Sequence, residues 1–239
     1  MMTYLKKHYS MTVSLSRRRS TLAAVLGCGV ILLVATPSIP AVVIPPPGLQ
    51  SGDQYQLLFV TRDMRNATST NIADYDAFVN AQAALGTTLP TGVSWSALAS
   101  TSTVAAKNHV PTTSNIPIYN TSGQRLYDNM YKLWNYSPLN MPAYDQFGNW
   151  CNRYVWTGSN STGTIYTGRA LGDPETCYGP SATTSWTWFG APGYYTSNST
   201  AYSIYAFSSV ITVPEPSTLV IFGVGAISLL GRAWRRKRA

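Results

Sequence analysis

The chain has 239 residues and a formal net charge of +8 at pH 7, but its basic residues are concentrated at the two ends. Residues 1–19 hold five of them and residues 232–238 hold another five, so the body between them, about residues 42–213, has seven basic residues against eight acidic ones. With a net charge of −1, the body has no basic stripe to hold phosphates, which excludes a nucleic-acid partner. Its length suffices for one domain with a hydrophobic core.

The N-terminal end, residues 1–41, has the pattern of a secretory signal peptide. Three arginines at residues 17–19 form the charged region, and residues 22–35 form the apolar region that follows it. Cleavage is expected between Ala35 and Ala41. We favour the general export route over the twin-arginine route, because no Phe-Leu pair follows the arginines at the required offset. The basic residues here are therefore a topology signal.

The first half of the body predicts one strand and one main helix. Residues 55–61 are aromatic and β-branched with a central apolar run, which favours a strand. Residues 71–85 predict a helix that Asn71 caps and that ends at Gly86. Its apolar face is expected to comprise Ile72, Tyr75, Val79 and Ala83.

The middle of the chain predicts mostly loops. Residues 87–115 are rich in Thr, Ser, Gly and Pro, with one short buried element expected around Trp95. A short strand is expected at residues 116–119. The pattern of residues 125–135 predicts a short helix or 3₁₀ segment, and an irregular loop follows it.

The last part of the body predicts short strands joined by polar turns. They are expected at residues 153–157, 170–172 and 186–189. A long alternating strand is expected at residues 202–213, immediately before the C-terminal tail. Helical and strand patterns in one chain of this length predict a single α+β domain.

Two cysteines, Cys151 and Cys177, remain after the signal peptide is removed. An even pair in an exported protein predicts a disulfide, here one closing a loop of about 25 residues. The alternative is a catalytic thiol, which needs a basic partner. His109, the one histidine of the body, lies in a Thr-rich loop. One histidine and two cysteines also lack the fourth strong ligand of a zinc site, so we expect no metal.

Three acidic residues are candidates for acid–base chemistry. Asp173 and Glu175 lie two residues apart in one loop, and Asp145 precedes another loop. Two acids with loop carbonyls can hold Ca²⁺, and a glycosidase needs two carboxylates across a cleft. Neither spacing is specific, and we interpret these side chains as solvated loop acids.

Aromatic residues are concentrated between residues 150 and 195. Most strand-borne tryptophans point inward, so packing in the core is the expected role. Aromatic faces beside amide and carboxylate groups also stack on sugar rings, and an exposed subset would make a glycan site. The candidate ligand-binding residues are Trp156, Asn160, Asp173, Glu175, Trp186 and Trp188.

The tail has three parts in a fixed order. Val213, Pro214, Glu215 and Pro216 come first, and the prolines favour extended backbone. Residues 219–231 then carry no charge, and the basic cluster follows. The positive-inside rule keeps that cluster in the cytoplasm and places the body across the membrane. An apolar run of this length spans about 20 Å of a roughly 30 Å hydrocarbon core, which predicts a weak anchor or a signal that is cut.

This tripartite order resembles the PEP-CTERM sorting signal of Gram-negative bacteria. The resemblance covers residues 214–239 and speaks to the destination of the protein. It implies an exosortase as the processing partner, cleavage near the Pro-Glu-Pro motif, and a short membrane-spanning helix before processing. It also implies a producer of exopolysaccharide or biofilm.

The body resembles the endostatin-type variant of the C-type-lectin-like fold. The resemblance rests on residues 116–128, on Trp134, and on the turn formed by Val155, Trp156, Thr157, Gly158 and Ser159. It implies short twisted antiparallel strands, one main helix, long loops, and a first strand paired with the last. The Glu-Pro-Asn and Trp-Asn-Asp calcium motifs of the lectins are absent, so no ligand class transfers.

We therefore expect a signal peptide (residues 1–41), an extracellular C-type-lectin-like domain (residues 42–213) and a sorting signal (residues 214–239). The expected function is that of a non-catalytic, cofactor-free component of the cell surface or extracellular matrix. An alternative is a carbohydrate-binding module that acts on exopolysaccharide. A second alternative is a secreted hydrolase that uses Asp145, Asp173 or Glu175.

Overall fold

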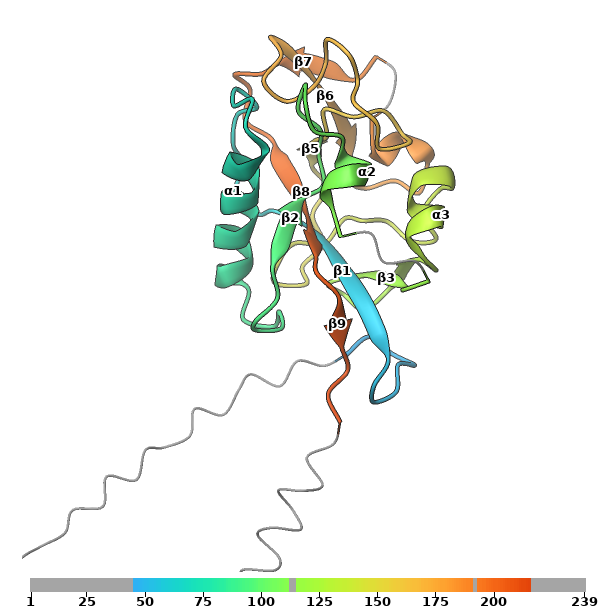
Figure 1. Cartoon of the computed structure of the whole chain (residues 1–239). Coiled ribbons are helices and arrows are strands. Elements are labelled where there is room, and N and C mark those ends of the chain that lie inside the picture. Colours follow the sequence, from blue (N-terminus) through green and yellow to red (C-terminus); the bar gives the residue numbers. More distant parts are fainter. Residues whose placement is uncertain (1–44, 112–114, 191–192, 216–239) are drawn as a thin grey trace, which may run out of the picture. The chain divides into compact units, whose positions relative to one another are not determined.

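The computed structural model describes residues 45–111, 115–190 and 193–215 (Figure 1). The expected signal peptide and the apolar run of the tail lie outside these residues, as does the membrane helix predicted there. Among the described residues, no helix is long and apolar enough to cross a membrane.

The described body is built on one mixed β-sheet. Its strands run in the order β4-β3-β1-β8-β5-β6-β7, while β2 also pairs with β8 and β9 with β1. The strands are β1 (Gln54–Val60), β2 (Trp95–Ala97), β3 (Ile118–Asn120), β4 (Arg125–Tyr127), β5 (Tyr154–Trp156), β6 (Glu175–Pro180), β7 (Tyr195–Ser197), β8 (Ser203–Ser208) and β9 (Ile211–Thr212). Helices α1 (Ile72–Leu85), α2 (Ala106–His109) and α3 (Met130–Asn135) and the 3₁₀ helix η1 (Trp186–Trp188) complete it.

The centre of the sheet is the antiparallel pair of β1 and β8, which confirms the expected pairing of the first and last strands. Phe59 lies opposite Ala206 in this register. Because side chains alternate across a strand, Leu57 and Phe59 enter one hydrophobic cluster and Leu58 and Val60 enter another. One buried strand thus organises the cores on both faces of the sheet.

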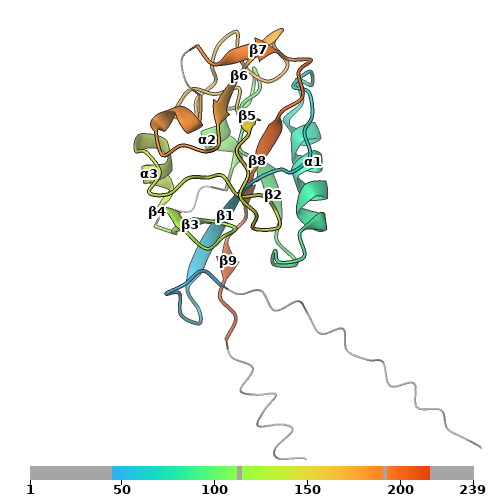
Figure 2. The ribbon, with the colours of Figure 1, turned by 180° about the vertical axis from the view of Figure 1, so that it is seen from behind.

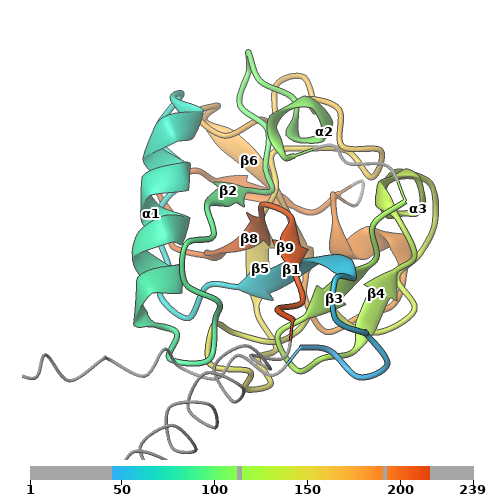
Figure 3. The ribbon, with the colours of Figure 1, turned by 60° about the horizontal axis from the view of Figure 1, so that its bottom comes forward.

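Helices cover both faces (Figure 3). Helix α1 begins at its predicted cap, where the Asn71 side chain accepts a hydrogen bond from Ala73 N, and ends at Gly86. Its buried Tyr75 and Val79 join the same cluster as Phe59. Residues of α2 and α3 enter the second cluster, on the other face.

Two strand predictions are wrong. Residues 186–188 form the 3₁₀ helix η1 rather than a strand, because Ser185 caps the segment and its side chain accepts from Thr187 N. Residues 170–172 form no strand and contribute one isolated bridge, between Leu171 and Thr101. A local cap therefore decides the first segment, and a contact with a distant residue fixes the second.

The prediction of a loop around Glu175 is also wrong, because strand β6 begins at this residue and pairs with β7. The segment at residues 125–135 divides into strand β4 and helix α3.

The lectin-like resemblance implied an antiparallel sheet, but the sheet is mixed. Strand β1 is parallel to β3, and β5 is parallel to β8. The α+β class holds, because one sheet and a few separate helices form the body. The lectin-like fold itself stays a prediction.

The predicted disulfide between Cys151 and Cys177 is wrong, since the structure contains no bond between them. Thr157 N donates to the carbonyl of Cys177 over 3.1 Å, whereas the carbonyl of Cys151 accepts from Ser181 Oγ over 2.9 Å. Ser181 and Cys177 lie four residues apart along an extended segment, or about 13 Å, so the two cysteines lie near opposite ends of β6. A disulfide needs Cα atoms within about 7 Å.

Candidate functional site

An open groove of about 430 Å³ lies between α3, η1 and the turn after β5. It brings together two of the predicted ligand-binding residues, Trp186 and Trp188. Its lining is aromatic and polar and comprises Leu133, Trp134, Asn135, Tyr136, Ser137, Ser161, Thr162, Trp186 and Trp188. No charged side chain belongs to this lining.

The aromatic residues of the groove differ in exposure. Trp186 is 48% exposed and Tyr136 is 57% exposed, so their rings are accessible to a ligand. Trp188 is only 2% exposed and is part of the hydrophobic core. Trp134 is half-buried and packs on Phe189, with 5.7 Å between ring centroids. The groove thus has two accessible rings above a packed aromatic base.

Two glycines hold the walls of the groove in place. A Cβ on Gly163 would lie 2.4 Å from the Trp134 ring, so the turn contacts this ring directly. A Cβ on Gly179 would lie 2.2 Å from the carbonyl oxygen of Trp188, so β6 contacts the backbone of η1. Close approach of this kind requires residues without a side chain.

Asn160 shapes the rim of the groove and does not line it. Its Oδ1 accepts from Thr162 N, Thr162 Oγ1 and Thr164 N, and its Nδ2 donates to Thr164 Oγ1. These bonds fix an Asx-type turn that presents Ser161 and Thr162 to the groove. Asn160 thus positions the rim of the groove, and its predicted role as a ligand-binding residue stays a prediction.

Trp156, also predicted to bind ligand, is fully buried in the core. Its Nε1 donates to the Arg65 carbonyl over 3.0 Å, which satisfies the indole. Residues alternate across β5 and β6, so Trp156 and Tyr178 share one face while Val155 and Gly179 share the face that η1 covers. Trp156 thus lies away from the groove.

The neighbouring acids Asp173 and Glu175, the second of them the first residue of β6, do not converge on a reacting centre. Asp173 Oδ2 accepts from Ala170 N over 2.8 Å within its own turn. Glu175 forms an ion pair with Arg169, whose guanidinium lies over the ring of Tyr195. Each acid has a local structural partner, and neither lines the groove. Within residues 45–215 as described, no group of three or more His, Cys, Asp or Glu side chains could hold a metal ion.

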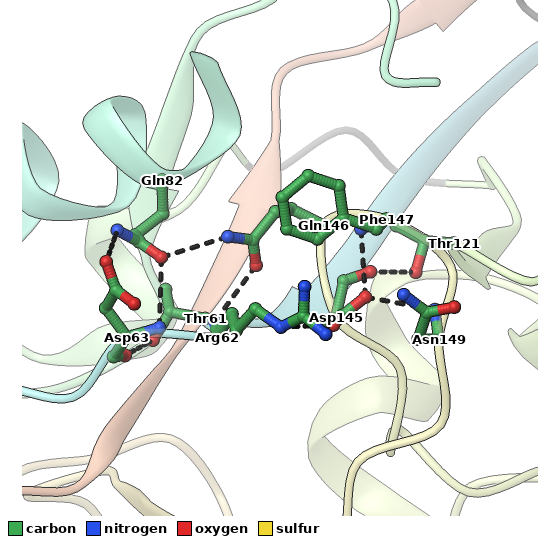
Figure 4. A network of polar contacts seen from close by, with 9 residues as sticks. All are labelled: Thr61, Arg62, Asp63, Gln82, Thr121, Asp145, Gln146, Phe147 and Asn149. Carbon is green, nitrogen blue, oxygen red and sulfur yellow. Dashed lines mark hydrogen bonds and ion pairs between the residues drawn. The ribbon is translucent and has the colours of Figure 1, made fainter. Parts of the chain in front are cut away.

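Asp145 is buried and organises a polar network that joins its loop to β1 and α1 (Figure 4). Its Oδ1 accepts from Phe147 N over 2.9 Å and from Asn149 N over 3.0 Å, and its Oδ2 lies 3.5 Å from Arg62 Nε. The neighbouring Gln146 donates from its Nε2 to Gln82 Oε1 on α1. The sequence signal for such a turn was the run Asp145 to Asn149, ending in Gly and Asn.

His109 also has a structural partner that the sequence did not indicate. Its Nε2 lies 2.9 Å from Asp76 Oδ1, and the same oxygen accepts from Ala97 N. The pair joins α2 to α1, and β2 is attached through the same carboxylate. The sequence pattern does not predict this contact, because the two residues lie 33 positions apart in the chain.

The tail leaves the body directly from the sheet, at the opposite end of the body from β7 (Figure 2). Val213 is buried, its N donates to the Asp53 carbonyl over 2.8 Å, and its own carbonyl accepts from Gly52 N over 3.0 Å. The next residues, Pro214 and Glu215, are exposed. Pro216 lies outside the described residues. The exposed proline motif therefore follows directly after Val213, whose backbone is hydrogen-bonded to the body.

Comparison of the chain with curated proteins finds no match. A protein-family model described as the PEP-CTERM protein-sorting motif matches residues 212–237. This match begins within β9 and includes the whole of the predicted sorting motif. It confirms the resemblance stated for the tail and indicates export to the cell envelope or surface. The chain carries a PEP-CTERM protein-sorting motif, which indicates an exported protein that is sorted by an exosortase.

Proposed function

We propose that this protein is a non-catalytic component of the cell surface or extracellular matrix and that it binds exopolysaccharide through the groove between α3 and η1. The observation that carries the proposal is the pair of accessible rings, Trp186 and Tyr136, beside hydroxyl and amide groups. Ligand sites typically combine aromatic walls with a few polar groups that fix orientation.

The chemistry of a sugar suits this lining. A pyranose ring carries C–H groups on a face and hydroxyls around its edge. The C–H groups are attracted to the negative face of an aromatic ring, while hydroxyls exchange hydrogen bonds with groups such as Asn135 and Ser137. A solvent-exposed groove also suits a polymer, because a chain can enter and leave without an end being threaded.

The placement of the acids supports a non-catalytic role. A glycosidase needs two carboxyl groups facing each other across the bond that is cleaved. Asp145 is buried within its turn, Asp173 accepts a turn amide, and Glu175 is ion-paired to Arg169. None of the three lines the groove.

The test is binding of the exported protein to immobilised polysaccharides, with Trp186→Ala as the variant. Loss of one exposed stacking ring should weaken binding about three- to tenfold. Trp150→Ala is the matched control, because Trp150 is also a tryptophan, is 53% exposed, and lies outside the groove. Equal binding by the wild type and both variants, or equal weakening in both variants, would refute the proposal.

A further inference from the structure

The aromatic surface of the groove continues beyond its lining onto the outer side of α3. Tyr131 is 66% exposed, the largest exposure among the large apolar and aromatic side chains of the described residues. Its ring centroid lies 6.2 Å from that of Tyr136, which lines the groove. Trp186, Tyr136 and Tyr131 therefore form one aromatic surface that is longer than the groove.

Tyr131 has no packing role that would explain a ring at this position. It is absent from both hydrophobic clusters, and the one aromatic neighbour found for it in the described part of the chain is Tyr136. Asn135 Nδ2 donates to the Tyr131 carbonyl, so the side chain is not needed for this bond. Exposed aromatic rings next to a pocket are typical of ligand contacts.

The groove has no charge to offer an acidic ligand. The nearby cation of α3, Lys132, is paired with Asp128, which also pairs with Arg125. On the other wall, Lys107 N donates to the carbonyl of Gly163, next to the rim residue Thr162. Its side chain is not part of the lining. An acidic sugar would thus lose hydration without gaining an ion pair.

We infer that the groove takes an internal stretch of a neutral polysaccharide, and that Tyr131 is an additional binding residue that contacts the chain outside the groove. This inference rests on the function proposed above. A chain that occupies Trp186 and Tyr136 continues over Tyr131, whereas a short oligosaccharide ends before it. Affinity therefore rises with chain length until Tyr131 is reached.

The experiment measures dissociation constants of the full exported protein for a neutral glucan or mannan and for its own short oligosaccharides. Tyr131→Ala should weaken polymer binding about three- to tenfold and leave binding of a disaccharide or trisaccharide unchanged. Tyr131→Phe should bind as the wild type does, because it keeps the ring. Tyr154→Ala, which removes a 49% exposed tyrosine outside the groove, is the matched control and should bind both ligands normally.

The ionic arm compares the same neutral polymer with a polyuronate while salt is raised about tenfold. The inference predicts weaker binding of the polyuronate, and neutral-polymer affinity that changes less than about twofold with salt. Tighter, salt-sensitive polyuronate binding that Lys107→Gln removes would overturn it, as would equal polymer affinity of the wild type and Tyr131→Ala. These results leave the proposed function intact, whereas a Trp186→Ala variant that binds every glycan normally contradicts the function itself.

Discussion

At the scale of single residues, Gly179 is placed where a side chain has no room. A Cβ there would lie 2.2 Å from the carbonyl oxygen of Trp188. We predict that Gly179→Ala lowers the free energy of unfolding by about 1–3 kcal/mol through overpacking, as measured by urea denaturation. Gly92→Ala is the control, because Gly92 has a positive φ and open space around it, and isolates backbone strain of about 1 kcal/mol. An equal loss of stability in the two variants would show that η1 can move away from the new side chain at residue 179 without cost.

Asp145 makes a second prediction at this scale. Its Oδ1 accepts two backbone N–H groups, and its partner Arg62 is more than half exposed. Asp145→Asn keeps an acceptor for those amides and should cost little stability, because the ion pair that it removes is open to solvent at its Arg62 end and such pairs contribute about 0–1 kcal/mol. Asp145→Ala leaves both amides without a partner and should cost about 1–3 kcal/mol. An equally large loss in Asp145→Asn would assign the stabilisation to the ion pair instead.

At the scale of elements, α1 depends on its N-terminal cap. Asn71 Oδ1 accepts from Ala73 N over 3.2 Å. Replacing Asn71 by Ala should lower the free energy of unfolding by about 0.5–2 kcal/mol, whereas Asn71→Ser should retain most of it. The measurement is the denaturation midpoint of the three proteins. A Ser variant as unstable as the Ala variant would show that the cap is not what holds this end of the helix.

Elements with a local signal were predictable from the sequence. The capped helix at residues 71–85 and the apolar strand at residues 55–61 carry their own periodicity, and the structure contains both. The pairing of β1 with β8 was expected from the lectin-like resemblance, and the structure contains it, whereas the register comes only from the structure. The element around Trp95 is likewise present, as β2.

Elements fixed by distant contacts were not predictable. Glu175 begins β6 because β5 and β7 pair with that segment, and nothing in its local pattern indicates a strand. The 3₁₀ turn of Trp186 and Trp188 was missed for a local reason, because the two residues alternate as in a strand while the cap at Ser185 sets the turn. Of the residues that line the groove, the sequence predicted only these two tryptophans as ligand-binding residues. Tyr136, Ser137 and the α3 wall come from a segment more than 45 residues away, which only the fold brings near.

At the scale of the whole molecule, buried thiols and phenols make stability fall in alkali. Burial raises the pKa of Cys151 from 9.0 to about 12, with Asp145 adding to the effect. Burial likewise raises the pKa of Cys177 to about 11 and that of Tyr75 to about 12. Below pH 9 both folded and unfolded states hold these protons, so the stabilisation is complete.

As the pH rises above about 9, the unfolded chain loses these protons first, and the stabilisation is lost towards pH 11 to 12. Urea midpoints measured between pH 8 and about 11 should therefore fall steadily. The Cys151→Ala variant should show a shallower fall than the wild type. A midpoint that stays constant or rises over this range would contradict the burial of these groups.

Processing of the tail is a second property of the whole molecule. Replacing both Pro214 and Pro216 with Ala leaves hydropathy and charge of the apolar run unchanged, so membrane insertion should persist. Cleavage should stop, because the extended motif is lost. Mass spectrometry of the C-terminal peptide from surface protein decides this. An intact terminus containing Trp234 in the wild type, in a host with its exosortase, would show that the tail is a plain anchor.

The central claim is that a sugar occupies the groove beside Trp186, and tryptophan fluorescence during titration with a bound polysaccharide tests it most directly. Contact with a sugar should shield the 48% exposed Trp186 ring, shift emission to shorter wavelength and reduce quenching by acrylamide. The account predicts these changes in the wild type and in Trp150→Phe, and their loss in Trp186→Phe. Changes that persist in Trp186→Phe and disappear in Trp150→Phe would place the ligand elsewhere and contradict it.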